Sequence, residues 1–389
     1  MVSLKSSLLS KDVAVLRLYE ALQKIPSRPF TDWLNLPEDK EKIVPSIKKF
    51  VRDRKGSWDK IIVMGMGGSA LGIVTLQKAF YPFDNRLTVL DNLDSNTINH
   101  HLSTLDPRRT LIIVISKSGT TLETMTQFEI FKAKYGKKLY QQNFIAITDP
   151  KEGELRKIVS RDKLASFPIP SQVGGRFSVL SAVGLLPFAL LGGNMDQLLK
   201  GAAEMKKRCF QKTAKNPALQ LAQITFDQKK PIVTFMSYDD QLYPLGFWYQ
   251  QLLAESIGKS KKVGLTPVPL RGASDQHSVL QLLQDGPNDK LNIFLEVENP
   301  HLDVRVPGTT LTVHNILRAE CNATEQALRE DGRPTIMIEI PEISPGTLGE
   351  LFMLFQMQIA ILGELYGVNA FNQPGVEKSK TIVKKFLEQ

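Results

Sequence analysis

The sequence predicts an α/β protein built from two doubly wound parallel sheets. Short, continuous runs of β-branched and apolar residues alternate with segments that have the apolar spacing of helices. Strands that are apolar along their whole length are typical of parallel sheets covered on both faces. The alternation occurs in the first half of the chain and starts again in the second half, which indicates two α/β layers of the same kind.

The individual elements follow from this pattern. In the first half, the predicted strands cover residues 61–64, 87–90, 111–115 and 144–147, and helical patterns follow at 70–80 and 122–135. In the second half, strands are predicted at 231–236, 292–296 and 335–339, with helices at 242–255 and 348–365. The last helix is apolar on all sides, so we expect it to be buried.

These elements divide the chain into four parts. We expect a helical N-terminal segment at 1–45, a first α/β domain at 46–200, a second at 201–370 and a C-terminal arm at 371–389. A chain of 389 residues is too long for one ordinary core, which agrees with two domains.

The composition and the apolar stretches favour a globular protein of the cytoplasm. The chain is 42% hydrophobic and 23% charged, as is usual for globular proteins. The longest apolar stretch, 182–191, is interrupted by Pro187 and is far shorter than the roughly 20 residues of a membrane span. The start of the chain lacks the apolar core of a signal peptide. We therefore expect a cytoplasmic protein without a membrane partner.

Charge and cysteine usage narrow the functions further. The formal net charge is +9, but the lysine pairs are scattered and do not alternate with aromatic residues, so we expect no nucleic-acid partner. A basic surface of this kind attracts anionic metabolites. Cys209 and Cys321 have no metal-ligand spacing, so the sequence predicts neither a disulfide nor a metal site.

Ser116-Lys117-Ser118-Gly119-Thr120-Thr121 is the first motif with chemical content. It follows a predicted buried strand and opens a helix, the place where parallel sheets bind ligands. Amides and hydroxyls at a helix N-terminus favour a phosphate there. The spacing of a P-loop is absent. Capping the helix needs only one such residue, so we favour a phosphate site over a simple cap.

The glycine-rich turn Gly65-Met66-Gly67-Gly68-Ser69 also joins a strand to a helix. A dinucleotide fingerprint needs glycine at position 70, where the chain has Ala70, so a nicotinamide cofactor is disfavoured. A tight turn that brings backbone amides near a ligand fits better. The alternative is a turn without a ligand.

Two further motifs supply opposite charges. Gly174-Gly175-Arg176-Phe177-Ser178 places an arginine beside two glycines, and its permanent charge suits stabilisation of an oxyanion. Glu255 ends a predicted apolar helix, where desolvation would adapt a carboxylate to general base catalysis. Taken alone, each is more often an exposed surface residue.

The most informative stretch runs from Gly272 to Gly286. It places His277, one of five histidines, between a polar turn and an apolar helix-like run. By itself such a histidine is more often structural. Together with the phosphate cradle, the arginine and the glutamate, it completes a set suited to proton transfer on a phosphorylated sugar.

With these motifs the chain resembles the glucose-6-phosphate isomerase (phosphoglucose isomerase) family, which is built from two sugar-isomerase (SIS) domains. The resemblance runs from about residue 60 to the C-terminus and includes Phe371-Asn372-Gln373-Pro374-Gly375-Val376-Glu377 and Lys380. It implies two SIS-type domains and an aldose–ketose isomerase of glycolysis and gluconeogenesis that converts glucose 6-phosphate and fructose 6-phosphate through a cis-enediolate.

The resemblance also implies a role for each site residue. The residues implied to hold the substrate, chiefly its phosphate, are Gly68, Ser69, Ser116, Lys117, Ser118, Thr121 and Gln373. Glu255 is implied as the base and Arg176 as the group that stabilises the enediolate. His277 and Lys380 are implied to assist ring opening. The histidine is implied to reach the site from the partner subunit, which implies a homodimer with shared active sites. No metal or cofactor is implied.

Two alternatives remain at this point. One is an isomerase on the same fold that also accepts mannose 6-phosphate. The other is a non-catalytic sugar-phosphate-binding regulator. A regulator has no need of a base, so the presence of Glu255, Arg176, His277 and Lys380 together argues against it.

Overall fold

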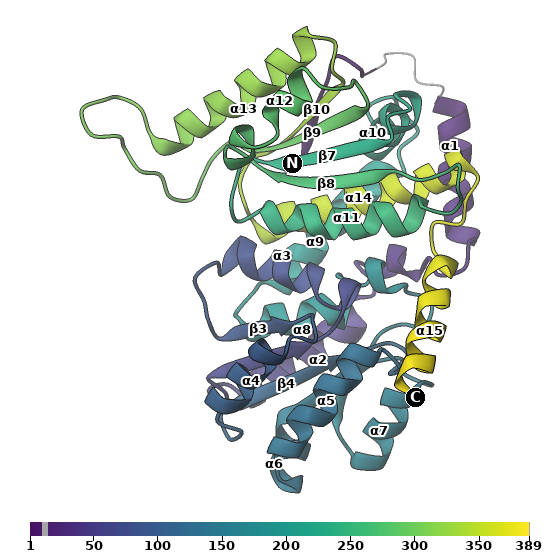
Figure 1. The fold of residues 1–389 in the computed structure, drawn as a ribbon, viewed down its shortest axis with the longest axis vertical. Helices are drawn as coiled ribbons and strands as arrows, with labels where there is room; N and C mark the ends of the chain where they lie inside the picture. Colours follow the sequence, from purple (N-terminus) through teal and green to yellow (C-terminus); the bar gives the residue numbers. More distant parts are fainter. Residues whose placement is uncertain (10–14, 389) are drawn as a thin grey trace.

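The computed structural model describes residues 1–9 and 15–388, and two five-stranded sheets form its framework (Figure 1). The first sheet has the order β3-β2-β4-β5-β6 and all its pairs are parallel. Its strands are β2 (Lys60–Met64), β3 (Leu87–Leu90), β4 (Thr110–Ile115), β5 (Phe144–Thr148) and β6 (Ala165–Pro168).

The second sheet has the order β1-β10-β9-β7-β8. Its strands are β1 (Ser3–Lys5), β7 (Ile232–Ser237), β8 (Thr266–Arg271), β9 (Lys290–Val297) and β10 (Thr335–Ile340). β1 pairs with β10 in the antiparallel sense, and the other pairs of this sheet are parallel. The predicted α/β class with parallel sheets is confirmed.

The sequence pattern missed three strands, and all three lie at sheet edges. β8 contains Pro267 and Pro269, and β6 ends on Pro168. Proline cannot donate to a sheet ladder, so an edge is where such strands are tolerated. β1 falls in the N-terminal segment that the sequence predicted as helical; there the helices are α1 (Val15–Lys24) and α2 (Lys40–Asp53), and residues 10–14 of that segment lie outside the described residues.

Both faces of the first sheet are buried, and alternate side chains of a strand pack into different clusters. Ile61 and Val63 belong to the large core shared with the rest of the molecule, whereas Ile62 and Met64 belong to a separate cluster on the other face. This alternation is the period of two that a strand imposes. The helices of this half are α3 (Leu71–Phe80), α4 (Ser95–Thr104), α5 (Leu122–Lys134), α6 (Lys137–Asn143), α7 (Glu154–Asp162) and α8 (Ala182–Leu190).

The second sheet is covered in the same way. Met236, Phe294 and Met337 pack with Cys321 and Leu328 on one face. The helices of this half are α9 (Met195–Cys209), α10 (Pro217–Asp227), α11 (Tyr243–Ile257), α12 (Leu280–Gln284), α13 (Val313–Glu330), and the long α14 (Pro345–Tyr366). α9 passes through residue 200, where the sequence placed a domain boundary, and packs against α14.

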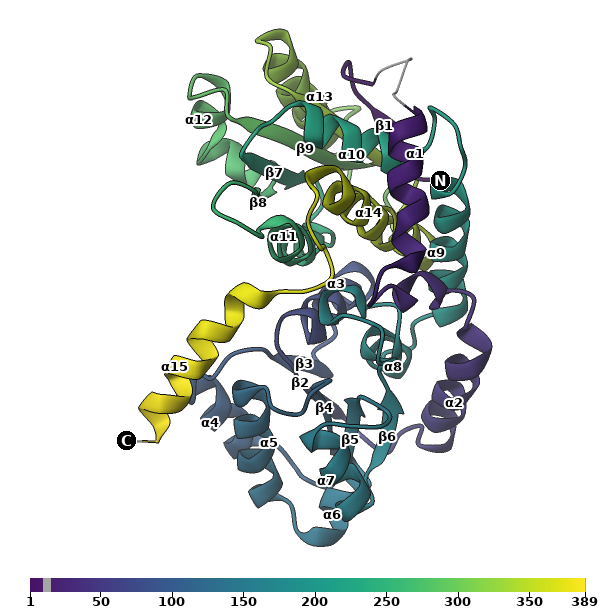
Figure 2. The same cartoon turned by 90° about the vertical axis from the view of Figure 1, so that its right-hand side faces the viewer.

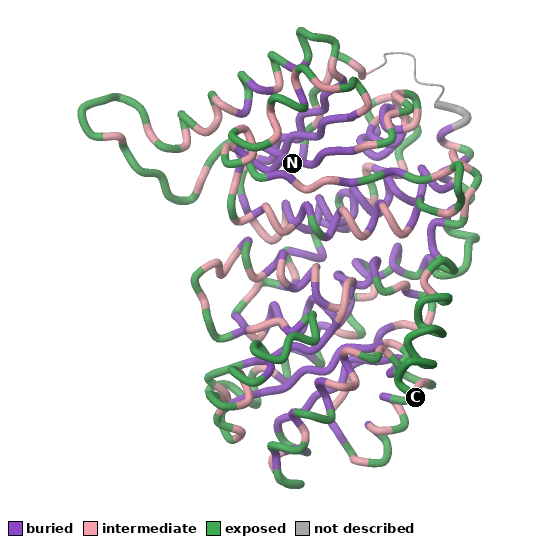
Figure 3. Tube along the Cα trace, viewed as in Figure 1, coloured by how far each residue is buried: buried purple, intermediate pink, exposed green. Residues whose placement is uncertain are grey.

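Helix α14 forms the centre of this core, as predicted for the apolar segment 348–365. It is long and apolar enough to span a membrane by length and composition, but 89% of that window is buried inside the fold. Its close packing on α9 depends on glycine, since a Cβ on Gly349 would lie 1.9 Å from the carbonyl oxygen of Leu198. Most residues of α14 are accordingly buried, which Figure 3 shows in purple.

The two halves meet where α11 packs against α3 (Figure 1). The chain then leaves α14 and ends in the short helix η6 (Pro374–Val376) and in α15 (Glu377–Leu387). Every residue of α15 is exposed, and Figure 2 shows α15 standing off the body beside the first half. The predicted C-terminal arm is therefore anchored by the residues that precede α15.

Candidate active site

A cavity of about 800 Å³ opens at the carboxyl edge of the first sheet. The turns that follow β2 and β4 form its floor, and the C-terminal end of α11 faces them. These two strands are neighbours at the point where the strand order reverses, which is where ligands bind in open parallel sheets. All predicted site residues except His277 line it: Gly68, Ser69, Ser116, Lys117, Ser118, Thr121, Arg176, Glu255, Gln373 and Lys380.

The turn after β4 is folded tightly around Ser116. The Ser116 hydroxyl accepts a hydrogen bond from the Gly119 amide at 3.0 Å and lies 3.1 Å from the Thr121 hydroxyl. Gly119 has a φ of 68°, a conformation that favours glycine. Thr121 makes no side-chain cap to α5. Its hydroxyl therefore borders the cavity instead of closing the helix, which argues against the simple-cap alternative.

Lys117 lines the same cavity, but its hydrogen bonds point away from it. The ammonium donates to the carbonyl oxygens of Ser171 at 2.6 Å and Val173 at 3.1 Å. Burial lowers the pKa of Lys117, and the nearby carboxylate of Asp149 opposes that shift. These bonds hold the 171–173 loop in place, so contact between Lys117 and a phosphate stays a prediction.

The glycine turns position the site by close approach. A Cβ on Gly68 would lie 2.3 Å from the carbonyl oxygen of Gly175, and one on Gly67 would lie 2.5 Å from the amide nitrogen of Gln251. Gly67 also has a φ of 52°. The helical turns η3 (Gly67–Ser69) and η4 (Gly175–Phe177) therefore touch directly, which brings Arg176 to the cavity.

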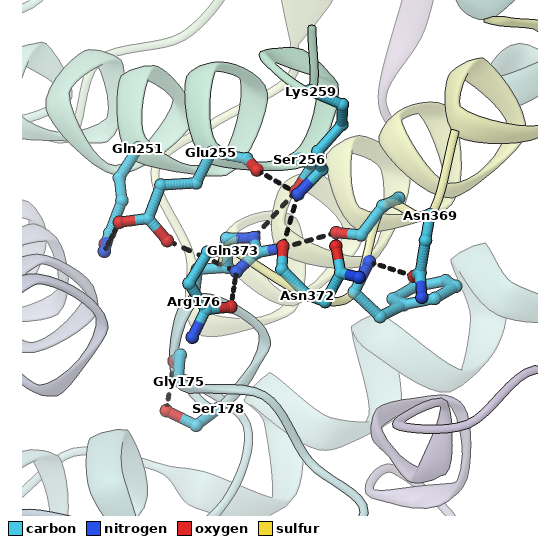
Figure 4. A network of polar contacts seen from close by, with 12 residues as sticks. Gly175, Arg176, Ser178, Gln251, Glu255, Ser256, Lys259, Asn369, Asn372 and Gln373 are labelled. Atoms are coloured by element: carbon cyan, nitrogen blue, oxygen red, sulfur yellow. Dashed lines mark hydrogen bonds and ion pairs between the residues drawn. The ribbon is translucent and has the colours of Figure 1, made fainter. Parts of the chain in front are cut away.

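Arg176 is buried, with 2% of its side chain exposed, so the surface-arginine alternative is excluded. Its guanidinium donates in several directions at once, as Figure 4 shows. The acceptors are the Ser256 hydroxyl at 2.7 Å, Glu255 Oε2 at 3.2 Å, Gln373 Oε1 at 3.0 Å, and the backbone carbonyls of Ala370 and Asn372. Burial lowers the pKa of Arg176, and Glu255 counteracts this effect.

Glu255 is paired instead of being isolated in an apolar pocket. Its side chain is 33% exposed. One carboxylate oxygen accepts from Arg176 and the other accepts from the Gln251 amide at 3.1 Å. The sequence placed Glu255 in a desolvating environment, whereas the structure places it between two donors at the edge of the cavity.

Gln251 is a site residue that the sequence reasoning missed. It lies one helical turn before Glu255, a spacing that puts two side chains on the same face of a helix. Its side-chain oxygen is buried and has no hydrogen-bond partner among the described residues. Gln251 lines the cavity and its amide donates to Glu255, so it can orient the proposed base. The four-residue spacing to Glu255 is the signal that could have identified it.

The C-terminal arm contributes two residues to the cavity. Gln373 reaches Arg176 directly, across 197 residues of chain. Lys380 lies on α15, where its ammonium pairs with Glu377 at 2.8 Å and both side chains are about two-thirds exposed. Lys380 borders the cavity, but its charge is not tied to the other site residues.

His277 does not reach this cavity. It lies on η5 (Ser274–His277), a turn after β8, and is exposed. Gln276 anchors this turn, since its amide donates to the hydroxyl of Tyr238 at 2.7 Å and to that of Thr324. The turn therefore directs Gln276 inward and His277 outward. Within one subunit, His277 is separate from Glu255 and Arg176.

Comparison with known proteins identifies the family of the chain. A family model described as phosphoglucose isomerase matches residues 44–294 and 313–389. The chain belongs to the phosphoglucose isomerase family. Most of the unmatched residues between these two ranges form the loop between β9 and α13, which projects from the body in Figure 1.

Individual relatives support the family assignment along most of the chain. A glucose-6-phosphate isomerase from Thermus thermophilus is 39% identical over 376 residues, covering 91% of this chain and 89% of the relative. A solved structure of a hypothetical protein, also from Thermus thermophilus, matches all of both chains with a TM-score of 0.94 and 36% identity. A glucose-6-phosphate isomerase from Chlamydia trachomatis shares the fold, with a TM-score of 0.88 at 22% identity, covering 100% of this chain and 88% of that one.

Proposed function

We propose that the protein interconverts glucose 6-phosphate and fructose 6-phosphate through a cis-enediolate. The observation that supports this most is the cavity in which the hydroxyl-rich turn after β4 faces the Glu255–Arg176 pair. Membership of the phosphoglucose isomerase family supports the same reaction. No observation favours the regulator or a second sugar substrate.

In this proposal the phosphate of the substrate binds at the carboxyl edge of the first sheet. The hydroxyls of Ser69, Ser116, Ser118 and Thr121 and the amides of the glycine turn at Gly68 would donate to the phosphate oxygens. The amides at the N-terminus of α5 add a favourable partial charge. Held in this way, the sugar carbons extend toward the end of α11.

The proposed chemistry takes place at that end. Glu255 would remove a proton from one of carbons 1 and 2 and return it to the other, as a general base and then a general acid, while the hydroxyl proton passes between the oxygens of the same two carbons. The enediolate that forms in between carries negative charge on oxygen, and the buried Arg176 would stabilise it. Arg176 keeps its proton under any physiological condition, so it acts by charge alone. Gln251 and Gln373 would orient the base and the sugar hydroxyls.

Opening of the sugar ring would need His277 and Lys380. Because His277 is exposed on η5 and does not reach the cavity of its own chain, we propose that His277 of the partner subunit completes each site in a homodimer. The partition into SIS domains at 46–200 and 201–370, and a cytoplasmic location without nucleic-acid or membrane partners, belong to the same proposal.

A coupled assay with fructose 6-phosphate tests the reaction. The wild-type protein should form glucose 6-phosphate, and the Glu255→Gln variant should not do so at a comparable rate. A parallel assay with mannose 6-phosphate should give no comparable turnover. A folded wild-type protein that binds fructose 6-phosphate without converting it would instead be a regulator.

Subunit exchange tests the shared site. Glu255→Gln and His277→Ala homodimers should each be inactive, and mixing them should create heterodimers with one intact site of two. About half of the dimers would be mixed, so about a quarter of wild-type activity should return. Exchange confirmed by mass spectrometry without recovered activity would place Glu255 and His277 in the same subunit's site.

A further inference from the structure

Lys259 links two parts of the site that are far apart in sequence. It is half-buried in the loop just after α11, two residues beyond the end of the helix. Its ammonium donates to the carbonyl oxygen of Glu255 at 2.6 Å and also to the carbonyl oxygen of Asn372. Figure 4 shows the Lys259 side chain reaching from the end of α11, the helix that carries Glu255, to residues 369–373. We call this segment, which leads into the C-terminal arm, the strap.

The strap at 369–373 is what holds the arm to the body. Phe371 is buried against Phe177, with 5.5 Å between the ring centroids. Arg176 donates to the carbonyls of Ala370 and Asn372. Beyond the strap, α15 is exposed along its length and packs chiefly against η6. The position of Gln373 and Lys380 is therefore set by bonds made to the strap.

We propose that Lys259 is a positioning residue for the isomerase reaction: its ammonium fastens the strap to the end of α11 and so fixes Gln373 and Lys380 relative to Glu255. The proposal rests on the proposed function, since it concerns the same site. Lys259 does not line the cavity, so it acts through the strap and not on the substrate.

A simpler role would be a cap for α11. A lysine near a helix C-terminus stabilises the last carbonyls and the negative end of the helix dipole, and the bond to Glu255 fits that role. The bond to Asn372 goes beyond it, because Asn372 belongs to another segment. The charged groups that face the ammonium are Arg176 on η4 and Glu255 on α11, and the strap offers only a carbonyl.

The location also carries an electrostatic cost, which a cap on an exposed helix end would avoid. Burial, with a further contribution from the charge of Arg176, lowers the pKa of Lys259 to about 8, and Glu255 opposes that shift. Two cations are thus held beside one carboxylate, and both donate to the carbonyl of Asn372. The strap is therefore held by donors from two segments, η4 through Arg176 and the loop after α11 through Lys259.

Three variants distinguish the proposed positioning role of Lys259 from a role as a simple helix cap. Lys259→Met keeps much of the side-chain volume and removes the donors. Lys259→Arg keeps charge and donors, and Lys262→Met removes an exposed lysine of the same loop as a matched control. For Lys259→Met we expect kcat to fall about tenfold, as for loss of one charged hydrogen bond, while KM for fructose 6-phosphate changes less than about threefold. Lys259→Arg should recover most of the activity, and Lys262→Met should match wild type.

Hydrogen exchange of the peptide that spans residues 367–376 gives a readout independent of activity. It should be faster in Lys259→Met than in the wild type and normal in Lys262→Met. A Lys259→Met protein that is less heat-stable but has wild-type kcat and wild-type exchange in this peptide would be a cap variant and would overturn the proposal. If the wild type does not isomerise fructose 6-phosphate, the proposed function fails, and the exchange measurement alone still decides whether Lys259 holds the strap.

Discussion

The two sheets have the same topology at their carboxyl edges but different chemistry there. In both, the strand order reverses between two central neighbours, β2 and β4 in the first sheet and β7 and β9 in the second. At the first edge the chain places glycines and hydroxyls. At the second edge β7 is followed by Asp239 and Asp240, beside a second cavity of about 730 Å³.

These carboxylates change what the second edge can bind. Asp240 is paired with Arg271 at 2.7 Å, so the charge of this arginine is already balanced. Asp239 accepts a hydrogen bond from the Gln241 amide at 2.8 Å, so one of the amides at the turn is already occupied. A phosphate would meet like charge at this edge. The fold thus supplies two equivalent positions, and the residues after the strands determine which ligands each position suits.

The second half contributes to the site through a helix instead of its strand ends. Glu255, Gln251 and Lys259 all lie on or just after α11, which crosses from the second sheet toward the first. The proposed phosphate anchor therefore comes from the first half of the chain, whereas the proposed base Glu255 comes from the second. Variants at each position should change different kinetic parameters.

The largest expected effect is at the reacting end. Glu255→Gln should lower kcat by about two to four orders of magnitude, the usual scale of general acid–base catalysis, because the amide cannot accept the proton. Asp239→Asn makes the same chemical change at the second edge and should leave kcat unaltered. Steady-state kinetics with fructose 6-phosphate measures both. Equal losses of kcat in the two variants would contradict a specific role for the Glu255 carboxylate.

The next effect is at the anchor. Thr121→Ala should raise KM for fructose 6-phosphate roughly 10- to 100-fold, because it removes one hydrogen bond to a charged phosphate. Ser116→Ala should act at least as strongly, since it also removes the acceptor of the Gly119 amide. Thr121→Ser keeps the hydroxyl and serves as the control. A fall in kcat at saturating substrate, with unchanged KM, would contradict the anchor role.

A smaller effect concerns the contact between the two glycine turns. Gly68→Ala would place a methyl group 2.3 Å from the Gly175 carbonyl oxygen, so η3 and η4 must separate, at a cost of about 1–3 kcal/mol. Gly175→Ala meets no atom within 4 Å and should change stability by less than about 0.5 kcal/mol. Chemical denaturation compares the two variants. Similar losses would mean that the turns do not depend on this contact.

The smallest effect is electrostatic and sharpens the contrast between the edges. Burial raises the pKa of Asp239, with Asp240 adding to the shift, so the folded state binds the proton more tightly than the unfolded state does. Stability therefore falls as pH rises through the pKa values of the two states, and the cost is complete above the folded value. Asp239→Asn should be more stable than wild type at pH 7, and the difference should shrink on acidification. A constant difference across pH would contradict this cause.

Much of the fold was predictable because it is encoded locally. The central strands are continuous apolar runs, and β4 and the turn after it were both predicted from adjacent residues. β8 was not, because Pro267 and Pro269 suit only an edge position, and sequence alone does not say which strand lies at an edge. β1 likewise depends on its pairing with β10, which lies at the opposite end of the chain.

The site shows the same limit. The motifs identified the residues that line the cavity, but their mutual contacts depend on tertiary structure. The bonds from Arg176 to Gln373 and from Lys259 to Asn372 join distant segments, so no local pattern predicts them. The ion pair of Glu255 could not be predicted from the sequence either, because it depends on η4 placing Arg176 beside it.

The central claim is that the first edge binds the phosphate while Glu255 performs the chemistry. Calorimetric titration of fructose 6-phosphate into Glu255→Gln proteins tests it without turnover. The single variant should bind with an affinity close to the wild-type KM. Adding Thr121→Ala should weaken binding roughly 10- to 100-fold, and adding Asp239→Asn should leave it unchanged. Equal affinity with and without Thr121→Ala, or weakening by Asp239→Asn alone, would contradict the claim.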